Sequence, residues 1–195
     1  MKKTSFFLGA LVLANSLYAG VCSDSFKYDF TFFGSPNKEY VVTKNTFTKF
    51  NVNFPEEKLL NATLEIDALS LDTSADMSNM GKEWPKAMAK TRNNNTINQF
   101  FKKFEKDPAK VSAKITEVGD SEIKVAFTMN GVTKEIPLSY KVENGLIKAS
   151  GKLEILDFNT QKAWEAFNRI CEKAFHHGKS WSEININFEV SDSCK

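Results

Sequence analysis

The chain of 195 residues has only two histidines, His176 and His177, and three cysteines. Adjacent side chains near a helix end point in different directions, so the two imidazoles would not face one metal ion. Even with the nearby Cys171, such an ion would lack well-placed third and fourth ligands. We therefore expect no metal site. The two histidines are assigned to a helix C-terminus, where an imidazolium complements the helix dipole.

Signatures of several enzyme classes are also missing. No nucleophile elbow accompanies a Ser-His-Asp order, no glycine-rich loop suits a phosphate, and no strand carries a carboxylate pair on its buried face. Without residues 1–19, the chain keeps 24 basic and 24 acidic residues, because only Lys2 and Lys3 are lost. The absences and the balanced charge predict a protein that is not an enzyme, needs no cofactor and binds no nucleic acid.

Long apolar runs are absent except at the start of the chain. A basic start and an apolar run within residues 1–14 precede a small residue for cleavage, so residues 1–19 are expected to be a secretory signal peptide. The run is too short to span a bilayer, and Val21 before Cys22 is a poor lipoprotein signature. We expect a periplasmic protein with no stable membrane anchor and one domain over residues 20–195.

The stretch from Val111 to Asp157 predicts four β-strands joined by three tight turns. Apolar residues occupy odd positions in the first two strands, pass to even positions across Asn130-Gly131, and return to odd positions across Asn144-Gly145. A two-residue Asn-Gly turn reverses the parity of the buried face, whereas the three-residue loop Val118-Gly119-Asp120 keeps it. The registers agree, which predicts an antiparallel meander with one buried face.

Alternation with even residues buried predicts four further strands, at residues 26–32, 46–54, 60–68 and 182–190. The third of these loses its parity after Ala68, where we expect a bulge or strand end near Ser70. From residue 73 to residue 108 the alternation vanishes. There Trp84-Pro85 should interrupt a helix, and a short helix is expected from caps at Asn95 and Thr96 to about Phe104.

An amphipathic helix is expected from Thr160 to Phe175, followed by Gly178 as its stop signal. Its apolar stripe carries Trp164 and Phe167. The predicted fold class is therefore mainly β: an eight-stranded antiparallel β-barrel, wide enough to be filled or to hold one small ligand, with a long amphipathic helix that covers one end and gates access.

Three cysteines in an exported protein allow at most one bridge. Cys22 precedes the first strand and Cys194 follows the last, so these two are the favoured pair if the two strands are antiparallel neighbours. A bridge from either to Cys171, or no bridge, stays open as an alternative. Cys171 lies on the apolar face of the helix, which favours a buried, inert thiol over a reactive one.

Three stretches resemble the YceI family: Ala62 to Thr73, Thr128 to Leu138 with its Asn-Gly-Val-Thr-Lys turn, and Ala149 to Asn159. Thr91-Arg92 and the pair Phe100-Phe101 also resemble the family's Arg and His segment, with asparagines where acidic residues and His are usual. The resemblance implies an exported protein with a lipocalin-like barrel that binds a lipid or polyisoprenoid. The chain looks like a divergent member with an added C-terminal helix.

The resemblance turns the inward aromatic residues into candidate ligand contacts. The expected binding set is Phe30, Phe32, Phe50, Phe54, Ile66, Phe127, Met129, Tyr140, Ile155 and Phe188 in the barrel, with Trp164 and Phe167 from the helix. The expected function is a non-enzymatic carrier of a polyisoprenoid or fatty-acyl lipid. Its alternatives are a filled barrel that serves as a structural or protein-interaction module, and a thiol redox protein that uses Cys171. The oligomeric state, with a homodimer among the options, stays open.

Overall fold

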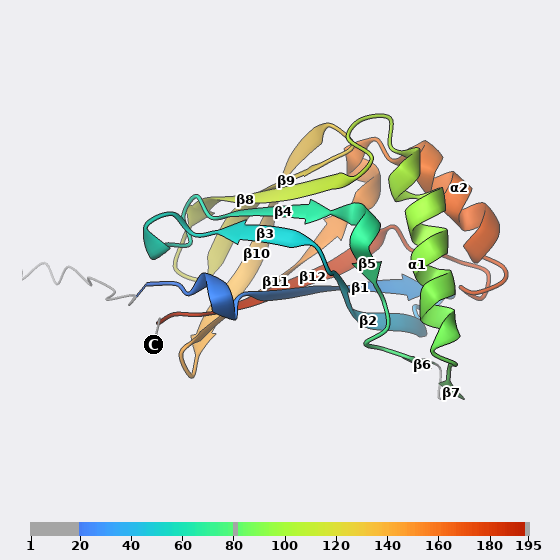
Figure 1. Ribbon diagram of the computed structural model, residues 1–195, viewed down its shortest axis with the longest axis horizontal. Helices are drawn as coiled ribbons and strands as arrows, with labels where there is room; N and C mark the ends of the chain where they lie inside the picture. Colours follow the sequence, from blue (N-terminus) through green and yellow to red (C-terminus); the bar gives the residue numbers. More distant parts are fainter. Residues whose placement is uncertain (1–19, 80–81, 194–195) are drawn as a thin grey trace, which may run out of the picture.

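A strongly curled antiparallel sheet of ten strands forms a half-barrel, and two helices lie across one of its ends (Figure 1). The computed structural model describes residues 20–79 and 82–193, so the predicted signal peptide lies outside the described residues. In spatial order the strands are β3 (Phe50–Asn53), β4 (Thr63–Asp67), β8 (Lys110–Val118), β9 (Glu122–Met129), β10 (Val132–Glu143), β11 (Leu146–Glu154), β12 (Glu183–Ser191), β1 (Lys27–Gly34), β2 (Tyr40–Phe47) and β5 (Leu71–Asp72). The short strands β6 (Ser78–Asn79) and β7 (Lys82–Glu83) pair separately.

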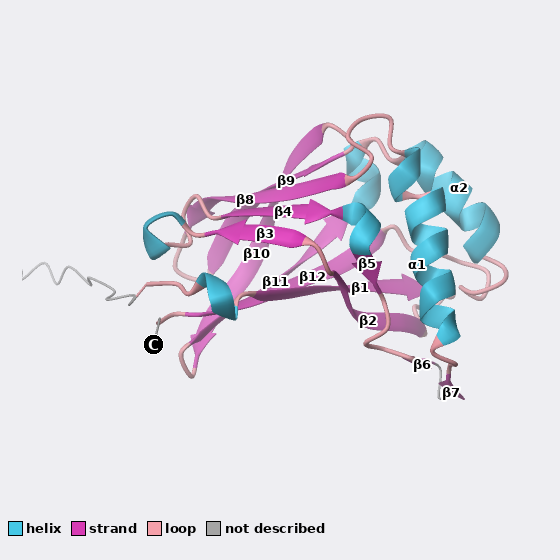
Figure 2. Cartoon of the chain, viewed as in Figure 1, coloured by secondary structure: helices cyan, strands magenta, loops and turns pink. Residues whose placement is uncertain are grey.

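The helices α1 (Ala87–Gln99) and α2 (Gln161–Cys171) pack against each other at the end of the half-barrel opposite the two described chain ends (Figure 2). The described part of the chain also holds five short 3₁₀ helices: η1 (Ser23–Ser25), η2 (Pro55–Glu57), η3 (Ala68–Ser70), η4 (Phe101–Lys103) and η5 (Ile155–Phe158). Within the described ranges, no helix has the length and apolar character needed to cross a membrane.

The central meander confirms the predicted registers across both Asn-Gly turns. Val132 pairs with Met129, and Glu143 pairs with Leu146. Asn130 and Gly131 have φ of 50° and 72°, and the second turn has 53° and 74°, as a type I′ turn requires. Local turn chemistry therefore sets the alignment of β9, β10 and β11.

The turn between β8 and β9 differs from the prediction. Val118 pairs with Ile123, so the loop has four residues, and its Gly119 N–H donates to the Glu122 carbonyl at 2.8 Å. The register shifts between Ile115 and Glu117, which marks a bulge. This bulge offsets the extra loop residue and keeps the buried face on odd positions.

The expected single strand at residues 46–54 is wrong, because the chain bends sharply at Thr48 and Lys49. Before the bend, β2 pairs with β1 and β5, and after it β3 pairs with β4. The bend is held by Ser70, whose carbonyl accepts from the Thr48 N–H at 3.0 Å and whose Oγ accepts from the Lys49 N–H at 2.9 Å. The sheet consequently has ten strands and remains a half-barrel, instead of the expected eight-stranded barrel.

Two other expectations near the sheet edge need correction. The strand predicted at residues 60–68 is confined to β4, and Leu60 is 45% exposed outside it. The expected end near Ser70 is confirmed, but it takes the form of η3. The helix expected to begin at Asn95 begins instead at Ala87, just after Pro85, where a proline does not interrupt helical hydrogen bonds.

The C-terminal helix is confirmed, although it ends at Cys171, before the expected Phe175. Thr160 precedes it, and its hydroxyl donates to the Ile155 carbonyl at 2.6 Å instead of capping the helix. Ala163, Phe167 and Cys171 form the buried face.

The Cys22 N–H donates to the Ser191 carbonyl at 3.2 Å, so the start of the described chain lies beside the end of β12. This proximity is what a bridge between Cys22 and Cys194 needs, but Cys194 lies outside the described residues and the bridge stays a prediction. Cys171 is a free, buried thiol, which makes the alternative pairings with it wrong.

Candidate apolar cavity of the half-barrel

Two clusters of buried apolar side chains fill the half-barrel. The cluster beneath the helices includes Phe47, Phe100, Phe101, Phe104, Phe158 and Phe167. The cluster at the opposite end includes Val21, Phe54, Ile123, Val125, Leu138 and Val190. Phe127 and Ile186 pack against both, so the two clusters form a continuous interior.

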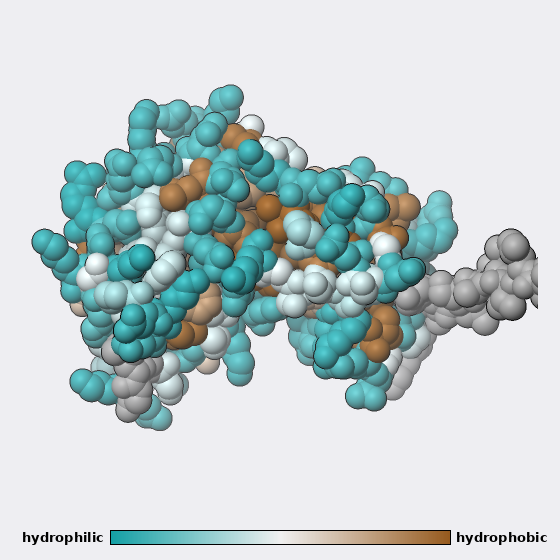
Figure 3. Space-filling view, turned by 180° about the vertical axis from the view of Figure 1, so that it is seen from behind, coloured by the Kyte–Doolittle hydropathy of each residue, from teal (hydrophilic) through white to brown (hydrophobic). Residues whose placement is uncertain are grey.

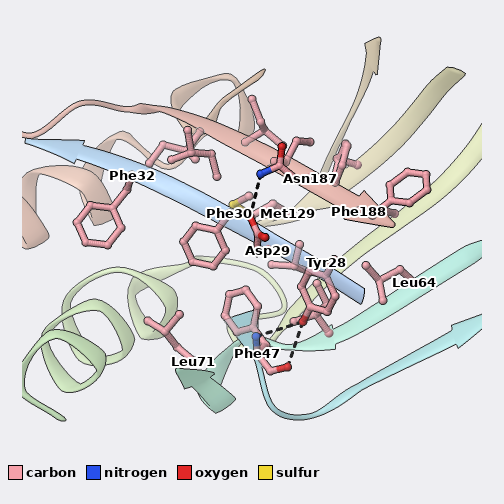
Figure 4. Close-up of a pocket in the computed structure, with 18 of the residues that line it drawn as sticks. Tyr28, Asp29, Phe30, Phe32, Phe47, Leu64, Leu71, Met129, Asn187 and Phe188 are labelled. Carbon is pink, nitrogen blue, oxygen red and sulfur yellow. Dashed lines mark hydrogen bonds between the residues drawn. The ribbon is translucent and has the colours of Figure 1, made fainter. Parts of the chain in front are cut away.

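A cavity of about 200 Å³ runs through this interior and is lined by residues of both clusters. On β1 the rings of Tyr28, Phe30 and Phe32 share one face and form the wall, because alternate side chains of a strand point to the same face. Figure 4 shows Tyr28, Phe30 and Phe32 projecting from β1, with Phe47 and Leu71 opposite them. Ile184, Ile186 and Phe188 extend the wall along β12 by the same alternation.

The helical end of the cavity is built from aromatic rings in tilted and edge-on contact. Trp164 and Phe167 on α2 have ring centroids 5.6 Å apart, and Phe100 meets Trp164 edge-on at 6.4 Å. Phe101 lies edge-on against Phe47 at 5.5 Å, which ties the segment after α1 to the sheet. These contacts close the end of the half-barrel with aromatic side chains.

Few polar side chains reach the wall, and Thr73 among them donates its hydroxyl to the Asn93 side chain at 2.8 Å. The Asn187 amide donates to the Asp29 carboxylate at 2.8 Å (Figure 4), and His176 Nδ1 lies 2.6 Å from the Ser180 hydroxyl. The Asn187–Asp29 pair is exposed to solvent, on the face of β1 and β12 opposite Phe30 and Phe188. The remaining wall is mostly aromatic and aliphatic, so the cavity favours an apolar ligand.

The sequence of this half-barrel matches a known family model. The match is to the YceI-like domain and covers residues 29–191. The chain belongs to the YceI-like family. This family is known for binding apolar ligands inside the barrel.

The chain is also similar to solved structures of low sequence identity. A mutant CJ YceI protein (CJ-G34C), described as for nanotechnology applications, is 17% identical over 78% of this chain and 85% of its own, with a TM-score of 0.48. Burkholderia cenocepacia BcnA is 14% identical over 84% of this chain and 94% of its own, with a TM-score of 0.44. None of the curated proteins matches the chain significantly.

Ten of the twelve residues predicted as ligand contacts line the cavity of this YceI-like chain. They are Phe30, Phe32, Phe54, Ile66, Phe127, Met129, Ile155, Trp164, Phe167 and Phe188. Phe50 and Tyr140 do not, and both border a separate outer groove. Both residues occupy inward-facing positions of their strands, as predicted. Phe50, however, lies at the sheet edge, where it is 42% exposed. Contact of any of these residues with a ligand remains a prediction.

The prediction left out lining residues that lie at the ends of strands and of a helix. Phe47 and Leu71 flank the bend held by Ser70, and Phe100 and Phe101 lie at the end of α1. The sequence placed Phe100 and Phe101 in the expected short helix and in the family resemblance, but not among the ligand contacts. No period-two pattern marks this pair, because it does not belong to a strand.

Arg92, the residue that resembles the family's Arg position, does not belong to the cavity wall. Its guanidinium Nη2 donates to the Thr73 carbonyl at 3.0 Å and to the Asp76 carbonyl at 2.8 Å. Arg92 therefore ties α1 to the segment that follows β5.

Lowering the pH should destabilise the protein through His176. Its side chain is 3% exposed, and burial lowers the pKa of its imidazole from 6.5 to about 4, with smaller contributions from His177 and Arg92. As the pH falls, the unfolded chain takes up the proton first. The stabilising effect of the neutral imidazole is therefore complete above about pH 6.5 and is lost towards pH 4, by about 3 kcal/mol in total. The expected role of His176 as a cation at a helix end is thus wrong.

Urea unfolding between about pH 7 and pH 4 measures this loss. His176→Gln should show a flatter pH dependence of the unfolding free energy than the unaltered protein. His177 is exposed and has a φ of 54°, which asparagine tolerates, so His177→Asn is the matched control and should keep the original slope. Equal slopes for His176→Gln and the unaltered protein would contradict the assignment.

Proposed function

We propose that the protein is a non-enzymatic carrier that holds one long apolar chain, polyisoprenoid or fatty acyl, in the cavity. The supporting observation is the wall itself, in which mostly aromatic and aliphatic side chains surround about 200 Å³. Small-molecule sites usually have volumes of roughly 300–1,000 Å³, so this narrow cavity suits a slim chain. Each methylene moved into it from water contributes about 0.8 kcal/mol.

We further propose that the carrier is exported to the periplasm. The support is the basic and apolar pattern of residues 1–19, which is typical of a secretory signal.

A protein-interaction module would need a contiguous apolar patch on its surface. The large apolar side chains that are most exposed come from separate elements: Phe50, Leu60, Leu69, Val118, Val142 and Ile170. Figure 3 shows one face of the molecule, where brown patches are divided by hydrophilic side chains. The carrier is favoured because the apolar surface is gathered inside.

A thiol redox role for Cys171 has little chemical support. Burial raises the pKa of the Cys171 thiol to about 11, and only a hydrogen bond with Asn95 acts in the other direction. Since the thiolate is the reactive form, the thiol remains protonated and unreactive at neutral pH.

A fluorescence titration with cis-parinaric acid tests the carrier directly. This long-chain polyene fatty acid fluoresces more strongly in apolar surroundings, so binding inside the cavity should give a saturable rise with a stoichiometry of one. A short-chain acid should compete poorly, because it transfers few methylenes from water. A linear, non-saturating response would count against the carrier.

A further inference from the structure

Along one line the half-barrel is not closed by backbone hydrogen bonds. Within the described residues, β3 pairs with β4 alone, and β1 pairs with β2 only from Phe30 to Gly34. The segment of β1 from Lys27 to Asp29 therefore has β12 on one side and no strand in register on the other.

Four aromatic rings fill the space between these two strands, and we call Phe26, Tyr28, Phe50 and Phe54 the aromatic seam. Tyr28 meets Phe50 edge-on with ring centroids 5.1 Å apart, and Phe26 lies 5.9 Å from Phe54. Phe26, Tyr28 and Phe54 also line the cavity, whereas Phe50 is 42% exposed. At the seam, therefore, only a layer of aromatic rings separates the cavity from solvent.

The Tyr28 hydroxyl fixes the end of the seam that lies next to Phe47. Tyr28 Oη accepts a hydrogen bond from the Phe47 N–H and donates one to the Phe47 carbonyl, both at 3.2 Å (Figure 4). Phe47 is the last residue of β2, just before the chain bends into β3. A side-chain hydroxyl therefore takes the place of the two backbone hydrogen bonds that a paired strand would supply.

The other route to the cavity, beneath the helices, is closed more firmly. Phe100, Phe101, Phe104 and Phe167 are each at most 8% exposed, and they pack together with α2. Moving the helices aside would expose all of them at once, which carries a large hydrophobic cost. Opening the seam requires only the rotation of rings, one of which already contacts solvent.

We propose that the apolar chain reaches the cavity laterally, through the aromatic seam between β1 and β3, and that the Tyr28 hydroxyl controls the rate of passage. This inference rests on the proposed function. In this proposal the gate for the ligand is the seam and not the helix α2, which was expected to gate access. Helix α2 is then a fixed end wall of the cavity.

Stopped-flow fluorescence with cis-parinaric acid tests the route. Tyr28→Phe keeps the ring and removes both hydrogen bonds to Phe47, so association and dissociation should each accelerate by about threefold to tenfold while the affinity changes little. Phe50→Leu opens the solvent side of the seam at an exposed position and should act in the same direction. The matched control is Thr133→Val, which loses a hydroxyl that pairs with Thr128 at 2.8 Å on the exposed face of the β9–β10 hairpin and should leave both rates unchanged.

Unchanged rates in both seam variants, with normal binding by the unaltered protein, would overturn the lateral route and leave the carrier function standing. Equal acceleration in Thr133→Val would overturn it as well, because the effect would then not be specific to the seam. Failure of the unaltered protein to bind the probe would reject the proposed function, and the route with it.

Discussion

Replacing Ala113 by phenylalanine should remove most of the binding of cis-parinaric acid while the sheet remains intact. Ala113 lies in the middle of β8, where it pairs with Leu64 on β4 and Phe127 on β9, and all three line the cavity. A phenyl ring at this position occupies space that the ligand needs. If it displaces as few as two methylenes at about 0.8 kcal/mol each, the affinity falls by at least about tenfold.

The neighbouring residue supplies the control for this variant. Ser112 precedes Ala113 on the same strand, so its side chain points to the opposite face of the sheet. Ser112→Phe adds the same ring outside the cavity and should leave the affinity unchanged. Circular dichroism verifies that both variants keep the β-sheet. A folded Ala113→Phe protein that binds the probe as tightly as before would show that the ligand site lies elsewhere.

Phe167→Ala should lower the free energy of unfolding by about 3–5 kcal/mol, the range for truncating a buried phenylalanine. The Phe167 ring is 8% exposed and has centroids 5.6 Å from Trp164 and 5.4 Å from His176. Truncation leaves a void between α2 and the core that these neighbours cannot fill without moving. Chemical denaturation monitored by circular dichroism gives the difference in stability.

Ile170→Ala on the same helix separates the effect of side-chain burial on the unfolding free energy from the effect of helix propensity. Ile170 is 42% exposed, so its truncation should change the unfolding free energy by no more than about 0.5 kcal/mol. Equal losses for the two variants would mean that α2 does not bury one face against the half-barrel.

The sheet registers could be predicted from the sequence because the determining signals are local. Asn130-Gly131 and Asn144-Gly145 specify their turns, and alternation assigns each following residue to a face. The bend at Thr48 and Lys49 had no such signal, since it depends on hydrogen bonds to Ser70, more than twenty residues away. Lys44, with a φ of 56°, further breaks the alternation along β2.

Much of the cavity wall could be predicted for the same reason. Inward parity selected Phe30, Phe32 and Phe127, which line the cavity, but it also selected Tyr140, which does not, although β10 has neighbours on both sides. It failed for Phe50, because parity does not tell an interior position from one at the open edge. Helix α1 was misjudged at its start because its asparagine-rich sequence has low intrinsic helix propensity, and its packing against α2 is a tertiary contact.

Native mass spectrometry of the protein purified from its natural compartment tests the central claim most directly. The carrier account predicts a population whose mass exceeds that of the chain by one lipid-like molecule. Organic extraction should release that molecule, and Ala113→Phe should abolish the adduct. A protein that carries no adduct, and that takes up no cis-parinaric acid when the probe is added, would contradict the account.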